Sequence, residues 1–141
     1  NGKRAVAPSL RAVEGEMMFP ELGISEAALR VIRKGMFEVM HGGLGTARRH
    51  NLPVSQGGMA GKTGTVQVKR ITKEQREAGI TKNIERPWKE RDHALFVGYA
   101  PVKNPRYAVS VVVEHGGSGS SMAAPIARAA LQRTMEIRGG A

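Results

Sequence analysis

The amino-acid sequence predicts an α+β fold in which an antiparallel sheet of three strands is flanked by helices. Two runs rich in β-branched and aromatic residues, 93–100 and 107–114, are separated by six residues that include two prolines. So short a connection favours an antiparallel hairpin. Helical periodicity falls outside these runs, over 25–41 and 122–137. Helices segregated from strands in this way are typical of an antiparallel sheet covered by helices.

Length and composition exclude several classes of protein. A chain of 141 residues forms at most one domain, or a piece of one. It has no cysteine, which excludes disulfides and thiolate metal sites. Its four histidines are scattered without ligand spacing, so we expect neither a metal site nor a cofactor. No apolar run approaches the roughly 18–20 residues of a membrane span. The chain begins Asn-Gly with no initiator methionine, which suggests that it starts inside a longer protein.

The net charge of +10 would suit a partner such as nucleic acid. Much of that charge falls in one segment, residues 69–91, where four acidic side chains are interspersed among eight basic ones. Trp88 is the only aromatic residue there that could stack on a base. We therefore interpret 69–91 as a solvated insertion and expect no nucleic-acid partner. A non-catalytic basic module that binds a polyanion, either nucleic acid or a cell-surface polymer, is the alternative function.

The N-terminal region predicts a loop followed by a helix. Residues 1–24 show no sustained period, apart from a short strand expected around 9–13. Ser25 can cap a helix over 25–41, with an acidic residue in its first turn, and Gly42-Gly43 ends it. Its apolar stripe, which we expect to lie in the core, consists of Leu29, Ile32, Met36, Val39 and Met40.

The remaining elements follow in order. After a glycine-rich connector at 42–58, a strand is indicated by four β-branched residues, Thr63, Thr65, Val66 and Val68. The two strands of the hairpin come next, and then a glycine-rich loop at 116–121 whose serines can cap the closing helix. Pro125 is compatible with that helix because it falls in the first turn.

The stretch GGMAGKTGTVQV, residues 57–68, contains a Gly-Lys-Thr that two kinds of site share. A phosphate-binding loop requires a glycine at the position that Gln56 occupies here, and a helix where this sequence turns β-branched. The other kind is the K-T-G element of penicillin-binding serine acyltransferases, which lies on a strand. There Lys62 and Gly64 would share one face and Thr63 and Thr65 the other. On an edge strand, Gly64 would leave room for a peptide backbone to pair with the free edge.

The sequence around this motif resembles the C-terminal part of the transpeptidase domain of class B penicillin-binding proteins, most closely the elongation transpeptidases of rod-shaped bacteria. The resemblance covers nearly the whole chain. It includes R-V-I-R-K-G-M-F-E-V-M, Gly45-Thr46-Ala47, M-A-G-K-T-G-T-V-Q-V, D-H-A-L-F-V-G-Y-A-P and N-P-R-Y-A-V-S-V-V-V-E-H-G-G-S-G.

The resemblance implies a peptidoglycan D,D-transpeptidase that cross-links stem peptides ending in D-Ala-D-Ala through a serine acyl-enzyme and is trapped by β-lactams. Lys62 would interact with the network around the nucleophile and with the terminal carboxylate of the substrate. The hydroxyls of Thr63 and Thr65 would help to hold that carboxylate, and the Thr65 N–H would form half of the oxyanion hole. Gly64 would provide clearance. The family also implies an inner-membrane anchor, a periplasmic location and membrane-protein partners of the elongation complex.

The chain departs from the family pattern in one respect. None of its serines is followed by lysine three residues later, and no S-x-N occurs. We therefore expect the nucleophile and its lysine to lie upstream, outside residues 1–141, which would form the C-terminal portion of one domain and be inactive alone. We expect non-catalytic roles for the remaining polar residues. His93 and His115 are expected to be structural, and Ser118, Ser120 and Ser121 to be loop and cap residues.

Overall fold

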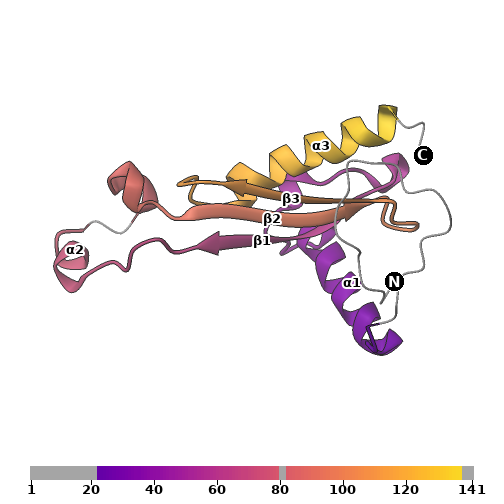
Figure 1. Cartoon of the computed structure of the whole chain (residues 1–141), viewed down its shortest axis with the longest axis horizontal. Helices are drawn as coiled ribbons and strands as arrows, with labels where there is room; N and C mark the ends of the chain where they lie inside the picture. The colour runs from indigo at the N-terminus through magenta and orange to yellow at the C-terminus, as the bar shows by residue number, and fades with distance from the viewer. Residues whose placement is uncertain (1–21, 80–81, 138–141) are drawn as a thin grey trace. The chain divides into compact units, whose positions relative to one another are not determined.

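The computed structural model describes residues 22–79 and 82–137, and it divides the chain into two compact units, 1–35 and 36–141. The short strand predicted around 9–13 lies outside the described residues. In chain order, the three strands come after a helix near the start of the described residues and before a helix at their end, as the colours of Figure 1 follow.

Helix α1, Glu26–His41, begins as predicted. The Ser25 hydroxyl accepts a hydrogen bond from the Ala28 N–H at 3.2 Å. The prediction that its whole apolar stripe is core is wrong, because Ile32 is 53% exposed whereas Met40 is fully buried. Periodicity identifies an apolar face but not what covers it, and only the last turn is buried here.

The sheet is antiparallel with the order β1-β2-β3, formed by Ala60–Val66, His93–Ala100 and Tyr107–Val113. This confirms the predicted hairpin and the three-stranded sheet. Because β1 pairs only with β2 among the described strands, it forms one edge of the sheet.

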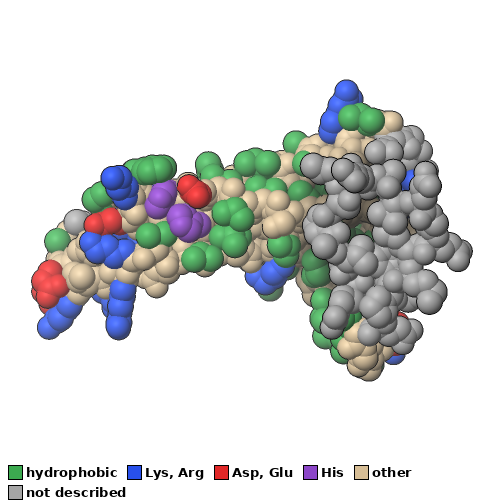
Figure 2. Space-filling model, in the orientation of Figure 1, with side chains coloured by type: hydrophobic (Ala, Val, Ile, Leu, Met, Phe, Trp, Pro, Cys, Tyr) green, Lys and Arg blue, Asp and Glu red, His purple; other side chains and the backbone are tan. Residues whose placement is uncertain are grey.

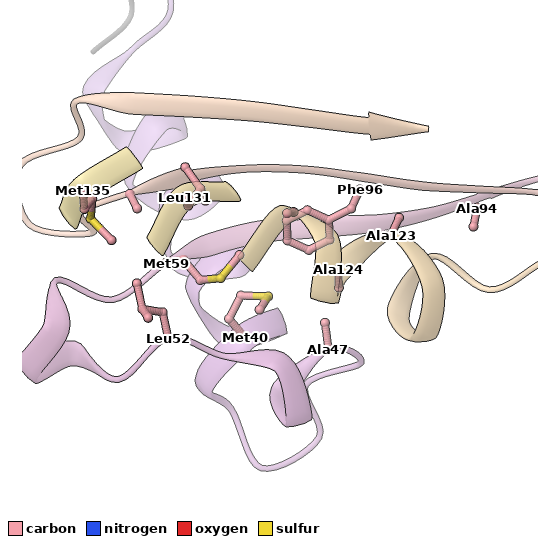
Figure 3. Close-up of a cluster of buried hydrophobic side chains, with 12 residues drawn as sticks. Met40, Ala47, Leu52, Met59, Ala94, Phe96, Ala123, Ala124, Leu131 and Met135 are labelled. Atoms are coloured by element: carbon pink, nitrogen blue, oxygen red, sulfur yellow. The ribbon is translucent and has the colours of Figure 1, made fainter. Parts of the chain in front are cut away.

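One face of the sheet is covered by helix α3, Ala124–Ile137. Alternate residues of β2 point into this core, and Phe96 is its largest fully buried side chain (Figure 3). The other core residues are Met40, Ala47, Leu52, Met59, Ala94, Ala100, Ala123, Ala124, Ala127, Leu131 and Met135. On the opposite face the side chains of Val97 and Val112 are 47% and 59% exposed.

The start of α3 differs from the prediction. The α-helix begins at Ala124, after a π-helical turn at Gly119–Ala123, and Pro125 lies in its first turn as expected. Ser118 makes no capping hydrogen bond through its side chain. Its carbonyl accepts from Met122 N–H at 2.9 Å, while its hydroxyl contacts that of Ser120 at 2.9 Å. The predicted capping role is therefore wrong for Ser118, because its hydroxyl contacts that of Ser120 and not a backbone N–H of the first turn.

Among the described residues, the regular structure in the connections consists of short helices. They are η1 (Arg48–His50), η2 (Val54–Gln56), α2 (Lys73–Glu77), η3 (Asn83–Glu85) and η4 (Trp88–Glu90). Segment 69–91 is largely solvated, and Figure 2 shows basic and acidic side chains interspersed over the end of the molecule that it forms. Three exposed or half-exposed pairs neutralise part of its charge: Lys69–Glu90, Lys73–Glu77 and Lys82–Glu85.

Arg86 is the exception within this segment, since its side chain is only 5% exposed. Its guanidinium donates two hydrogen bonds to the carboxylate of Asp92, at 3.3 and 3.1 Å. Arg86 also donates to the carbonyls of Lys69 and Glu90. This buried pair ties the two ends of the insertion together just before β2 begins.

Candidate active-site strand

The register of β1 against β2 separates the side chains of the K-T-G-T element onto two faces. Lys62 lies opposite Val97 and Gly64 opposite Leu95, on the face that α3 does not cover. Thr63 lies opposite the buried Phe96, on the face toward α3. The alternation predicted from the sequence is therefore present, and β1 is an edge strand among the described residues.

Lys62 presents a free positive charge. Its side chain is exposed, and its ammonium donates to the carbonyl of Thr63 at 2.7 Å. Within the described parts of the chain no carboxylate forms an ion pair with it, although several lysines of the insertion are paired. A cation without a counter-ion at a sheet edge is suited to binding an anion.

The half-buried Thr63 shares a hydrogen bond with Thr46, whose hydroxyl oxygen lies 3.2 Å from its own. Thr46 belongs to the loop that follows α1 and is 17 positions away in the sequence. Sequence reasoning did not identify Thr46 as a site residue. Its only signal was the Gly45-Thr46-Ala47 triplet within the family resemblance.

Gly64 has close neighbours on both sides. A Cβ at this position would lie 3.2 Å from the Cβ of Leu95, which is tighter than an ordinary contact. From the other direction Gly119 packs against the same peptide: a Cβ on Gly119 would lie 3.0 Å from Gly64 N and closer still to the carbonyl oxygens of Gly64 and Leu95. The π-helical turn thus fixes the position of the β1 backbone, and the sequence analysis missed this role for Gly119.

The two histidines near the end of the sheet have structural contacts. The His115 N–H donates to His93 Nδ1 at 2.8 Å, and His115 Nδ1 lies 2.9 Å from the carbonyl oxygen of Arg91. The ring of Trp88 lies 4.3 Å from that of His115. These contacts fasten the insertion to the ends of β2 and β3. Among residues 22–79 and 82–137, no group of three or more His, Cys, Asp or Glu side chains could hold a metal ion.

An antiparallel sheet whose edge strand reads Lys-Thr-Gly-Thr, backed by a helix, is the arrangement expected of the enzymes whose serine is acylated by penicillin. Comparison with known families agrees. Residues 13–132 match the penicillin binding protein transpeptidase domain, and the chain belongs to this family. The match supports the transpeptidase interpretation and not the alternative of a basic polyanion-binding module.

Two curated proteins of the same name are similar to this chain over most of its length. The peptidoglycan D,D-transpeptidase MrdA of Haemophilus influenzae is 33% identical over 139 residues, which cover 91% of this chain and 20% of that protein. The protein of the same name from Acinetobacter baumannii is 33% identical over 140 residues, covering 89% of this chain and 19% of its own length. The chain thus spans about a fifth of the length of the curated relatives it matches.

Solved structures confirm the predicted fold class. The Pseudomonas aeruginosa PBP2 structure in complex with WCK 5153 is 35% identical, with a TM-score of 0.54 over 89% of this chain and 22% of that one. The structure of a complex between PBP2 and MreC from Helicobacter pylori has a TM-score of 0.65 at 23% identity, over 91% of this chain and 21% of that one. The latter comparison bears on the fold alone.

Proposed function

We propose that this chain forms the K-T-G-T wall of the active site in a peptidoglycan D,D-transpeptidase. The observation that carries the proposal is the exposed ammonium of Lys62 on an edge strand, next to Gly64, with no carboxylate partner among the described residues. A cation, neighbouring hydroxyls and a free strand edge together suit an extended peptide that ends in a carboxylate.

Each residue of the element has a proposed role. Lys62 attracts the terminal carboxylate of a D-Ala-D-Ala stem peptide and contributes to the polar network around the nucleophile. The hydroxyls of Thr63 and Thr65 donate hydrogen bonds to that carboxylate. The Thr65 N–H stabilises the developing oxyanion, a role for which one donor is typically worth about 100–1000-fold in rate. Gly64 keeps the strand free of a side chain where the substrate backbone approaches.

The reaction we propose is acyl transfer through a serine. The serine oxygen forms an ester with the penultimate D-alanine as the amide C–N bond breaks, and the departing D-alanine amine takes up the serine proton. An amine of a second stem peptide then attacks the ester carbonyl. The ester C–O bond breaks, the serine oxygen takes up the proton that the amine loses, and the new amide is the cross-link. A β-lactam would acylate the same serine without releasing a leaving group. Because no S-x-x-K occurs in these 141 residues, the serine comes from another segment of the protein.

We further propose that residues 1–141 are the C-terminal portion of one transpeptidase domain, with 69–91 as an insertion between strands. The exposed valines of the uncovered sheet face, Val97 and Val112, suit packing against the rest of that domain, which carries the serine. An inner-membrane anchor, a periplasmic active site and membrane-protein partners from the elongation machinery follow from the family resemblance. Within the described residues, no helix is both long and apolar enough to cross a membrane.

A test of this proposal uses the full-length protein that contains this chain, incubated with benzylpenicillin and analysed by denaturing intact-mass spectrometry. We expect one penicilloyl adduct on the full-length protein and none on the isolated 141 residues. Lys62→Ala should slow acylation by roughly 10- to 100-fold, since it removes a charge-assisted contact. Lys103→Ala removes another exposed lysine, from the turn between β2 and β3, and should leave the rate unchanged. Absence of any adduct on the full-length protein would overturn the proposal.

A further inference from the structure

Thr46 lies outside the K-T-G-T element but contacts it directly. Its hydroxyl oxygen is 3.2 Å from that of Thr63, and either oxygen can be the donor. Since a threonine hydroxyl has one proton and two acceptor lone pairs, the direction of this bond decides what Thr63 can offer to a ligand.

The loop that carries Thr46 is held firmly at both ends. The N–H of the buried Ala47 donates to the carbonyl of Val39 at 3.1 Å, and Gly45 N–H donates to Gly42 O at 2.9 Å. Arg48 donates through Nη1 to the carbonyl of Gly43 at 2.8 Å. Thr46 is therefore presented to Thr63 from a fixed backbone and does not have to be ordered when a ligand binds.

We propose that Thr46 is a positioning residue that orients the hydroxyl of Thr63 toward the substrate carboxylate. The inference rests on the proposed function, in which Thr63 donates to that carboxylate. When Thr63 donates its only proton forward, it can still accept, and Thr46 is the donor behind it. A hydroxyl that accepts one hydrogen bond becomes a better donor of the next, so the two threonines act as a relay toward the anion.

Stabilisation of the fold does not account for this hydrogen bond between Thr46 and Thr63. Thr46 is exposed and Thr63 is only half-buried, so water can satisfy both hydroxyls when the bond is lost. Removing the Thr46 hydroxyl should therefore leave the thermal stability almost unchanged. Its effect should appear in reactions with a ligand that carries a carboxylate.

The experiment is a double-mutant cycle on the full-length protein, with the second-order rate constant of acylation by benzylpenicillin as the readout. Thr46→Val should lower this rate constant roughly 3- to 10-fold, the loss typical of one hydrogen bond, and Thr46→Ser should restore it. In a Thr63→Val background, Thr46→Val should change the rate by less than about twofold. Thr134→Val, which removes a hydroxyl that donates to Ala130 O within α3, is the matched control and should have no effect.

A second probe, the methyl ester of benzylpenicillin, has the same β-lactam without the negative charge. We expect Thr46→Val to affect acylation by the ester much less than acylation by the acid. Equal losses with Thr63 present or absent would overturn the inference, and so would faster acylation by the acid, which would mean that Thr63 donates to Thr46. If the unmodified protein is acylated by neither probe, the proposed function itself fails, and this outcome is distinct from the others.

Discussion

The tight contact between Gly119 and Gly64 makes a strong prediction about how β1 is positioned. Replacing Gly119 with alanine adds one methyl group, whose carbon would lie 3.0 Å from Gly64 N and closer still to two carbonyl oxygens. All three atoms belong to the backbone of β1 or β2, so no flexible side chain can move aside. Either the π-helical turn or β1 has to shift. Overpacking of this kind typically costs about 1–3 kcal/mol of folding free energy.

The displacement should affect chemistry as well as stability, since the affected peptide lies within the K-T-G-T element. A misplacement of about 1 Å at a reacting centre can cost on the order of 100-fold in rate. For Gly119→Ala in the full-length protein we therefore expect a melting temperature several degrees lower, because about 1 kcal/mol corresponds to about 2–4 °C in a domain of roughly 150–250 residues. We also expect slower acylation by benzylpenicillin.

Gly43 provides the matched control. It also lies in a loop, but a Cβ there would meet nothing within 4 Å, so Gly43→Ala should change neither quantity. The reasoning is refuted if Gly119→Ala retains both the melting temperature and the acylation rate of the unmodified protein. A loss of stability with an unchanged acylation rate would show that the π-helical turn yields to the methyl group while β1 keeps its place.

Two further predictions concern stability, measured by the melting temperature of the full-length protein. Phe96→Ala should cost about 3–5 kcal/mol because it empties the centre of the core, whereas Ile84→Ala, at a residue of the insertion that is 68% exposed, should cost much less. Arg86→Met should cost about 3–5 kcal/mol because it leaves the carboxylate of Asp92, whose side chain is 15% exposed, without its partner. Replacing both members of that pair with apolar residues should cost less than replacing Arg86 alone, and an equal cost would contradict the pairing argument.

The sequence predicted those features that depend on local patterns. The strand at 93–100 has the predicted bounds, because its apolar run and the proline after it are both local signals. The hairpin and the cap of α1 by Ser25 likewise follow from neighbouring residues. The K-T-G-T element was assigned to a strand because the residues after it are β-branched, and β1 confirms this.

The features that were missed all involve contacts between distant parts of the chain. In the sequence, Arg86 is one of eight basic residues in an insertion that was predicted to be solvated. In the structure it is buried, pairs with Asp92 and fixes the base of that insertion. Glycine-rich runs were interpreted as flexible connections, and nothing local distinguishes Gly119 from the other glycines of its loop. Only the packing of the π-helical turn against β1 reveals which glycine must lack a side chain.

The same distinction applies to the site itself. Lys62 and Thr63 are recognisable from sequence because the role proposed for them, binding a carboxylate, suits a cation next to a hydroxyl. Thr46 and Gly119 have no such chemical signature, since they act on the element through position: one from the loop after α1 and the other from the turn before α3. If the free side of β1 accepts a substrate, as proposed, the strand can be held only from its paired side and its two faces. The residues that hold it therefore come from elements far away in the sequence, and mutations there should affect acylation without altering any residue that touches the substrate.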